Sequence, residues 1–378
     1  MFKTPKPSTL LKIVLVLVLL YFFLLGIKFT GTSFKLFGKD FAEQLITIYA
    51  NPFAGLFTGI LVTSIIQSSS TTTSLIVGLA STGILPIGSA IPILMGANMG
   101  TTITNTLVAL TFVTRKEDFR RAFAAATMHD FFNLFAIIIF FPLELTLHII
   151  EKSALFLTDI FQGVGGVTFV GPLKLTMDPV VKGFQHLLTD TIGIPDIAAG
   201  IIMIVIAVAL VVTALIYLVK VMRSLVIEQT ESFIDKYIFR NTFTALTLGM
   251  LLTAVVQSSS VTTSMVVPLV AAGFLGLNRA YPFTLGANIG TTVTAILASL
   301  ATLSAETGAP ANTLGLTVAL CHLLFNVYGT IIFLPLRKLP ISVATWMGNV
   351  AAESKKWAFV FIACVFFLLP LLILFLTR

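Results

Sequence analysis

The feature that most constrains this sequence is a long stretch without charge. No Asp, Glu, Lys or Arg occurs from Gln44 to Thr114, which is 71 residues. Lipid, or protein buried in lipid, has to surround so long an apolar stretch. Only 10% of the whole chain is charged and 57% is hydrophobic, whereas a soluble chain carries about 25% charged residues. The sequence therefore predicts an all-α polytopic membrane protein, and it excludes a soluble domain, a disordered tail and a nucleic-acid-binding protein.

Several segments are long and apolar enough to cross a bilayer, which takes about 20 residues. The predicted spans are 10–28, 86–112, 120–142, 196–222, 279–303, 312–335 and 356–377. Two other apolar stretches, 50–83 and 241–276, each carry a polar run in the middle. Each is too short for two full spans at about 1.5 Å rise per residue. We expect each to form a re-entrant hairpin, whose two half-helices enter and leave the membrane on one side.

An internal repeat organises these segments. The run Gln67–Ser74 recurs at Gln257–Ser264, the motif Gly96–Thr102 recurs at Gly286–Thr292, and 22 of 44 residues are identical between 67–110 and 257–300. The predicted repeats are 1–143 and 196–336, each with one span, one hairpin and two more spans. Residues 144–195 would form an interfacial helix and an extracellular loop, and 337–378 an interfacial segment and the last span. Because each repeat crosses three times, the second enters from the opposite side, and such inverted repeats hold a binding site near the bilayer midplane.

Basic residues predict the orientation. Lysines and arginines cluster up to Lys12 and within 115–121, 220–240 and 337–356, and these clusters share one side if the hairpins do not cross. That side is cytoplasmic by the positive-inside rule. We therefore expect a multi-pass protein of the cell (inner) membrane with a cytoplasmic N-terminus. Lys28, Lys35 and Lys39 then lie outside, against the rule.

The two polar runs are the first candidate site. Eight consecutive side chains from Gln67 to Ser74 can form hydrogen bonds, and so can seven of the eight in the second copy. Such runs are tolerated at membrane depth only against protein or a water-filled cavity. Their hydroxyl and amide oxygens suit Na⁺, and the N-termini of the half-helices suit an anion. Helix packing through small residues is the alternative interpretation.

The motif Gly-Ala-Asn-x-Gly-Thr-Thr places two glycines inside each of two predicted spans. Glycine weakens a helix by about 1 kcal/mol, so a local break is expected in both copies. It would free carbonyls beside Asn98, Thr101, Asn288 and Thr291. Close packing of helices through the glycines is the alternative.

Asp130 is the only charged residue between Ala122 and Leu143. A carboxylate in mid-span costs about 2.5–3.5 kcal/mol on insertion scales, so an ionised Asp130 needs a cation. Na⁺ is the first candidate and a proton the second, with a protonated structural Asp as the alternative. The second repeat has Leu323 at this position, which limits such a site to one half. His129 and His322 are best explained as interhelical hydrogen-bonding groups.

Together these motifs, with Phe119–Phe123 leading to His129–Asn133, resemble the type II sodium-dependent phosphate cotransporters, and the compact chain is similar to a bacterial member. The resemblance implies a symporter that takes up inorganic phosphate, driven by the Na⁺ gradient, through alternating access. Transport would be electrogenic, because an acid at the position of Asp130 accompanies charge movement in the family. A Na⁺-coupled carrier of another small anion, sulfate or a carboxylate, is the alternative.

The resemblance also implies ligands. One Na⁺ site would use Gln257, Ser258, Ser259, Thr101 and Thr294, and another would use Asp130, Asn133 and Thr106. The expected phosphate ligands are the two hairpin tips and two asparagines, namely Gln67, Ser68, Ser69, Ser70, Ser258, Ser259, Ser260, Asn98 and Asn288. We expect no enzymatic activity and no cofactor besides co-transported Na⁺. Inorganic phosphate, Na⁺ and the lipid bilayer are the expected partners, nucleic acid is not, and a homodimer is left open.

Overall fold

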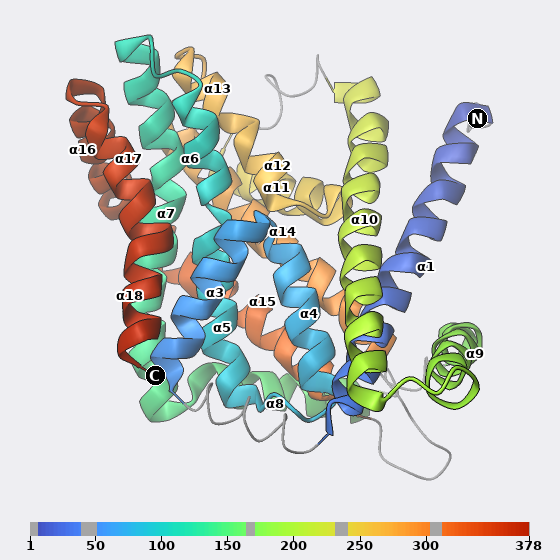
Figure 1. Ribbon diagram of the computed structural model, residues 1–378. Coiled ribbons are helices and arrows are strands. Elements are labelled where there is room, and N and C mark those ends of the chain that lie inside the picture. The colour runs from blue at the N-terminus through green and yellow to red at the C-terminus, as the bar shows by residue number, and fades with distance from the viewer. Residues whose placement is uncertain (1–6, 39–50, 164–170, 231–240, 303–311, 378) are drawn as a thin grey trace.

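The computed structural model (Figure 1) describes residues 7–38, 51–163, 171–230, 241–302 and 312–377. Within these ranges the chain forms helices and the turns between them, without strands. The predicted all-α class is therefore confirmed. The basic residues Lys3, Lys6, Lys39, Lys236 and Arg240 lie outside the described ranges, as does residue 50 at the start of the first predicted hairpin.

The helices of the described chain follow one another in this sequence order. The first half of the described chain contains α1 (Pro7–Leu36), α3 (Pro52–Ile66), α4 (Ser69–Ser81), α5 (Ile87–Thr101), α6 (Ile103–Leu110), α7 (Lys116–Leu147), α8 (Ile149–Gly163), α9 (Gly171–His186) and the π-helical turn η1 (Leu187–Thr191). The second half contains α10 (Asp196–Thr230), α11 (Thr242–Val256), α12 (Ser259–Ser264), α13 (Val266–Ala271), α14 (Leu277–Thr302), α15 (Leu314–Phe333), α16 (Lys338–Glu353), α17 (Lys356–Ala363), η3 (Cys364–Leu368) and α18 (Leu369–Leu376).

Six helical segments of the described chain have the length and apolar composition needed to cross a membrane. They are Val14–Leu36, Lys116–Leu147, Asp196–Leu218, Leu277–Thr302, Leu314–Phe333 and Lys356–Leu376. Each matches a predicted span. The remaining predicted span, 86–112, is divided into α5 and α6 at Thr102, close to the motif where a helix break is expected.

The division at Thr102 is a change in hydrogen bonding. The Thr102 N–H donates to the Met99 carbonyl at 3.3 Å, three residues back, and its hydroxyl donates to the same carbonyl at 2.7 Å. The expected helix break is thus confirmed in the first copy. It is wrong for the second copy, since α14 continues unbroken through Gly286 and Gly290.

The predicted loop before residue 196 also needs correction. Much of it is helical, as α9 and η1. Its glycines and prolines suggested a loop, but Met177 and Val181, one turn apart, form a buried apolar face, and α9 packs against α1. Burial of this face outweighs the weak local helix propensity of the segment.

Figure 1 shows how the elements are arranged. The α3–α4 pair rises from the bottom of the view to a turn at mid-height, while α13 lies near the top and α8 lies across the bottom. The first helix α1 runs downward and α10 runs upward beside it. The start of α1 and the end of α18 therefore lie at opposite ends of the bundle.

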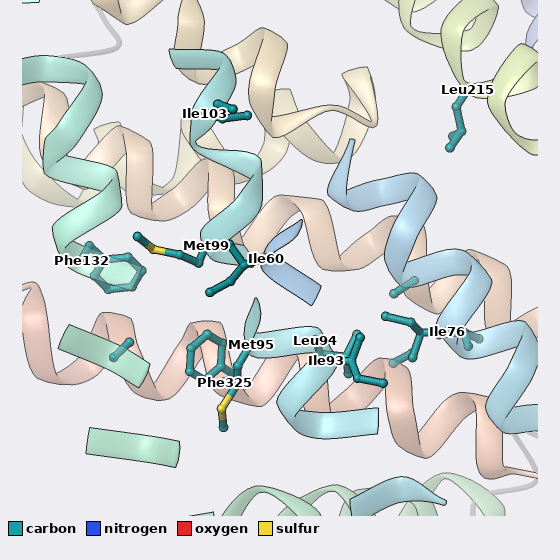
Figure 2. Packing of buried hydrophobic residues seen from close by; sticks show 14 of the residues in the cluster. Ile60, Ile76, Ile93, Leu94, Met95, Met99, Ile103, Phe132, Leu215 and Phe325 are labelled. Atoms are coloured by element: carbon teal, nitrogen blue, oxygen red, sulfur yellow. The ribbon is translucent and has the colours of Figure 1, made fainter. Parts of the chain in front are cut away.

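The apolar core joins these helices below the α3–α4 turn. In Figure 2, Met99 of α5 lies between Ile60 of α3 and Phe132 of α7. All three side chains are buried. Because this core fixes α3, α5 and α7 against one another, it positions the polar residues that the same helices carry.

Two helix pairs approach until their backbones touch. A Cβ atom on Gly96 of α5 would lie 2.8 Å from the Ile60 nitrogen and 3.0 Å from the Gly59 Cα on α3. In the second copy, a Cβ on Gly286 of α14 would lie 2.9 Å from the Met250 nitrogen on α11. The spacing Gly-x-x-x-Gly in both copies suits this geometry. The close-packing interpretation of these glycines therefore holds in both copies.

We predict that Gly96→Ala lowers the stability of the protein. The added methyl group meets the backbone of α3, and overpacking of this kind costs about 1–3 kcal/mol. The matched control is Gly183→Ala in α9, where a Cβ meets nothing within 4 Å and helix propensity improves by about 1 kcal/mol. Thermal unfolding in detergent should show a lower midpoint for the first variant only. Equal midpoints would show that α3 and α5 separate easily.

Candidate functional site

The same turn is built at both hairpin tips. Gln67 ends α3 and Gln257 ends α11, and both adopt the left-handed conformation, with φ/ψ of 57°/26° and 60°/23°. Their N–H groups donate to the carbonyls of Thr63 and Thr253, each at 2.7 Å. A residue other than glycine is uncommon in this region of φ/ψ. Its presence at both tips shows that the repeated sequence encodes a repeated local structure.

The serine after each glutamine begins the next helix. Ser68 and Ser258 are extended N-cap residues, whose hydroxyl oxygens accept hydrogen bonds from the N–H groups of Thr71 at 3.2 Å and Val261 at 3.3 Å. Such caps leave other N–H groups of the first turn without partners in their own helix. The N-termini of α4 and α12 therefore direct backbone donors toward the tips.

The two tips touch. The Ser70 hydroxyl on α4 donates to the Gln257 carbonyl at 3.1 Å, although 187 residues separate them. Close by, the Thr263 hydroxyl on α12 donates to the Asn105 side-chain oxygen on α6 at 3.0 Å. The structure thus brings the two polar runs together, as the sequence predicts.

The two glutamines differ in their surroundings. Gln67 is exposed. Gln257 is 7% exposed, its side-chain oxygen accepts from the Thr294 hydroxyl at 2.8 Å, and its side-chain nitrogen donates to the Ala254 carbonyl. The adjacent Ser69, Ser70 and Ser259 are buried, and Ser68, Ser258 and Ser260 are half-buried. Gln257 is therefore more buried than Gln67, whereas Ser70 of the first tip is more buried than Ser260 of the second.

The predicted Na⁺ ligands around Gln257 lie on several elements. Gln257, Ser258 and Ser259 are consecutive, and Thr294 of α14 is joined to Gln257 by the hydrogen bond just described. Thr101, at the end of α5, is buried and donates to its own helix at Ala97, at 2.9 Å. It lies one turn before Asn105, which contacts α12.

The helix break at Thr102 frees one carbonyl, and a side chain takes it. Because the Thr102 N–H bonds to Met99, the Asn98 carbonyl lacks its usual partner four residues on. The Asn133 side-chain nitrogen, from α7, donates to that carbonyl at 3.1 Å. In the second repeat, Asn326 instead donates to His322 in its own helix, at 3.0 Å.

A network of amides extends from this point across both repeats. The Asn288 side-chain nitrogen donates to the side-chain oxygens of Asn133 at 3.2 Å and Asn326 at 2.6 Å. A ring nitrogen of His322 pairs with the Asn98 side-chain oxygen at 3.2 Å. His322 therefore forms the interhelical hydrogen bond expected of it. Both amide hydrogens of Asn288 are used, whereas the Asn98 side-chain nitrogen has no hydrogen-bond partner among the described residues.

His129 and Asp130 contrast with this network. Asp130 is 1% exposed, and neither its oxygens nor the ring nitrogens of His129 meet hydrogen-bond geometry with a described residue. The Thr102 side chain lies close to the Asp130 carboxyl group, and the Asn288 side chain lies close to the His129 ring. Asn133 follows Asp130 by one turn, and the Thr106 hydroxyl, also buried, donates to Ile103 at 2.7 Å. A carboxylate so placed needs a bound cation or a proton.

Two further contacts between the repeats were not predicted. The Arg121 side chain on α7 donates to the Ala271 carbonyl at the end of α13 at 2.8 Å, and the Asn312 side chain before α15 donates to the Ser81 carbonyl at the end of α4 at 2.5 Å. Ser81 and Ala271 are equivalent in the two repeats. The repeat offset could have identified these two carbonyls, but neither Arg121 nor Asn312 belongs to a repeated motif. Asn105 was missed for the same reason, since Ala295 replaces it in the second copy.

Comparisons with known proteins agree with these features. The Na⁺/Pi-cotransporter family model matches residues 22–170 and 210–338. The chain is 35% identical to sodium-dependent phosphate transport protein 2A of Ovis aries, over 96% of the chain and 67% of that protein. It is 32% identical to protein 2B of Homo sapiens, over 95% of the chain and 64% of that protein. The chain therefore spans about two thirds of the length of these curated relatives. No solved structure gives a significant match.

We predict that Asn133→Leu destabilises the protein. The variant leaves the buried Asn98 carbonyl and one Asn288 hydrogen without partners, and an unsatisfied buried group costs about 1–3 kcal/mol. The control is Asn278→Leu, at an exposed position of α14. Thermal unfolding in detergent should show a lower midpoint for Asn133→Leu alone. An unchanged midpoint would mean that the freed carbonyl needs no protein partner.

Proposed function

Because the chain belongs to the Na⁺/Pi-cotransporter family, we propose that it is a secondary active symporter that takes up inorganic phosphate with Na⁺. The observation that carries the proposal furthest is the contact between the two tips, from the Ser70 hydroxyl to the Gln257 carbonyl. It joins hydroxyl-rich runs from two repeats in the interior of a multi-pass membrane protein. Residues of both halves can therefore contribute to one binding site.

The charge of phosphate explains why Na⁺ is required. Inorganic phosphate carries between about one and two negative charges near pH 7, because its mono- and dianionic forms coexist there. No Lys or Arg occurs from Gln44 to Thr114 or from Asn241 to Asn278, the segments that contain the tips. Helix N-termini, hydroxyl groups and bound cations have to offset the charge instead. Na⁺ that binds first would supply the missing positive charge and couple the two substrates.

The proposed phosphate ligands are the tip residues 67–70 and 258–260, with Asn98. Ser69 and Ser259 lie in the first turns of α4 and α12, beside the backbone donors of those turns. The amide donor of Asn98 has no partner within the described part of the chain. Asn288, the remaining predicted ligand, already donates both of its amide hydrogens to other asparagines, so it would have to give up one of them. The geometry therefore favours Asn98 over Asn288.

The proposed Na⁺ sites use oxygen atoms beside interrupted helices, as in other transporters with broken helices. One is the group of Gln257, Ser258, Ser259 and Thr294, with Thr101 approaching from α5. The other is Asp130 with Asn133 and Thr106, next to the break at Thr102. The buried Asp130 carboxylate, which has no hydrogen-bond partner in the described ranges, supports the second site. Since Leu323 replaces Asp130 in the other repeat, this site gives the proposed electrogenic transport a single charged ligand.

Several features support inverted repeats and alternating access. We assign 1–143 and 196–336 to the repeats, with re-entrant hairpins at 50–83 and 241–276. Their first helices, α1 and α10, run in opposite directions (Figure 1). The equivalent carbonyls of Ser81 and Ala271 each accept a side chain of the other repeat. We propose that these two contacts close the outer and the cytoplasmic end of the site in turn, in a carrier of the cell membrane with a cytoplasmic N-terminus.

Uptake by the purified protein in liposomes tests the proposed function. Radiolabelled phosphate should accumulate when a Na⁺ gradient points inward, and much less when K⁺ replaces Na⁺. Excess sulfate or a carboxylate should compete weakly. Strong competition by either would favour the alternative, a Na⁺-coupled carrier of another anion, and uptake independent of Na⁺ would contradict symport.

We predict that Asp130→Asn raises the Na⁺ concentration for half-maximal uptake by about tenfold or more, equivalent to about 1.4 kcal/mol. The variant keeps the size of the side chain but removes the charge that would hold the cation. The current across the liposome membrane during uptake should be smaller in the variant than in wild type. The control is Asn105→Ala, which leaves Asp130 in place and removes a buried contact at the tips without removing a charge. Unchanged Na⁺ dependence and current in Asp130→Asn would make Asp130 structural.

We predict that Arg121→Gln opens one end of the site more often. Its guanidinium donates to Ala271 and also pairs with Asp118 at 2.9 Å, so the variant weakens a charge-assisted contact. A single cysteine at Ser260, in a chain without Cys321 and Cys364, should be labelled several times faster by a reagent applied from the cytoplasmic side. Asn312→Ala is the matched variant at the other end and should speed labelling from outside instead. Equal effects from both sides would contradict separate closing contacts.

A further inference from the structure

A polar cavity lies away from the tips. Its volume is about 240 Å³, and it lies between α1, α9 and the ends of α4 and α14. The side chains that matter here are Lys28, Lys35, Asp178, Lys182, Thr32 and Asn312. At about 30 Å³ for each water molecule in the liquid, this volume corresponds to about eight waters. A small anion with several waters therefore fits.

The cavity has an excess of positive charge. Of its three lysines, Lys28 pairs with Asp178. Lys35 and Lys182 have no acidic partner among the described residues, and both are exposed. They come from different helices, α1 and α9, and line the same cavity. The ammonium groups of Lys35 and Lys182 thus line one partly open cavity, beside the Thr32 hydroxyl and the Asn312 amide.

A simpler explanation is that these lysines only offset the negative ends of helices. The helices α1, α4 and α14 all end near the cavity, and each end is worth at most about half a negative charge. Hydroxyl groups already cap two of these ends, because Thr82 donates to Leu79 at 2.6 Å and Thr302 donates to Ser299 at 2.8 Å. Lys182 offsets no end at all, since α9 continues directly into η1. Positive charge therefore remains after this correction.

We propose that this cavity is a second anion site, which holds a phosphate group between Lys35 and Lys182. It differs from the site at the tips in its chemistry. Lysine supplies the positive charge here, so binding needs no Na⁺. The phosphate group can belong to free inorganic phosphate or to the headgroup of an anionic lipid.

The position of the cavity suggests what binding of free phosphate there could contribute to transport. The helix α4 connects the two places, since Ser69 begins it at the tip and Ser81 ends it at the cavity. Its 13 residues correspond to about 20 Å. By the predicted topology this end faces outside, where a basic cavity would raise the local concentration of an anion before uptake. This use rests on the proposed function, whereas the anion site itself does not.

Binding without Na⁺ tests the site separately from transport. Inorganic phosphate is titrated calorimetrically into the purified full-length protein in detergent, with K⁺ as the cation. Wild type should bind, and the double variant Lys35→Gln/Lys182→Gln should bind about tenfold more weakly. The control is Lys152→Gln, an exposed lysine on α8 outside the cavity, which should bind like wild type. Because both cavity lysines are exposed, all variants should keep the wild-type melting temperature.

A parallel titration identifies the source of the phosphate group. The same proteins are placed in nanodiscs of phosphatidylcholine with or without phosphatidylglycerol. If phosphatidylglycerol binds, and the double variant alone loses this binding, the site holds a lipid headgroup. If neither ligand distinguishes the double variant from wild type, the proposal is wrong. If the wild-type protein binds phosphate without Na⁺ but shows no Na⁺-driven uptake in liposomes, the proposed function is wrong and the anion site stands.

Discussion

The structure depends on one constraint, which is that backbone groups inside a membrane need partners within the protein. Each hairpin tip interrupts a helix, and the break at Thr102 interrupts another. The freed groups are met by side chains, from the same repeat in one case and from the other repeat in another. Asn133 takes the Asn98 carbonyl and Ser70 takes the Gln257 carbonyl. The same polar groups that make the broken helices tolerable are therefore the ones that surround the candidate site.

Much of this arrangement could be predicted from the sequence. The repeated Gln-Ser-Ser-Ser run predicted where two helices would turn and meet. Polar side chains inside an apolar segment are tolerated only against protein or water, so the two runs had to face the interior. Apolar length correctly predicted the six described helices that are long and apolar enough to cross a membrane. The helix α9 was missed because its stability comes from burial of Met177 and Val181, which local composition does not express. The contacts of Arg121 and Asn312 were missed because neither residue belongs to a repeated motif that would predict its partner in the other repeat.

The two copies are not equivalent, and one residue accounts for much of the difference. In the first repeat Asn133 reaches over to α5, so the helix can break at Thr102 without loss. In the second repeat Asn326 bonds within its own helix, and α14 stays intact. The glycines alone therefore do not determine a break, since both copies have them. An acceptable partner for the freed carbonyl is also needed, and sequence motifs do not reveal it.

The glycine contacts limit how this molecule can move. The main chains of α3 and α5 touch at Gly96, and those of α11 and α14 touch at Gly286. At these positions no side chain lies between the helices that could change rotamer as they move. Sliding one helix past the other would force backbone atoms together, so each pair moves as one rigid body. Relative movement then falls between the two helix pairs, at the hydroxyl contacts of the tips. Such hydrogen bonds can be replaced by bonds to water or to a bound substrate at little cost in free energy.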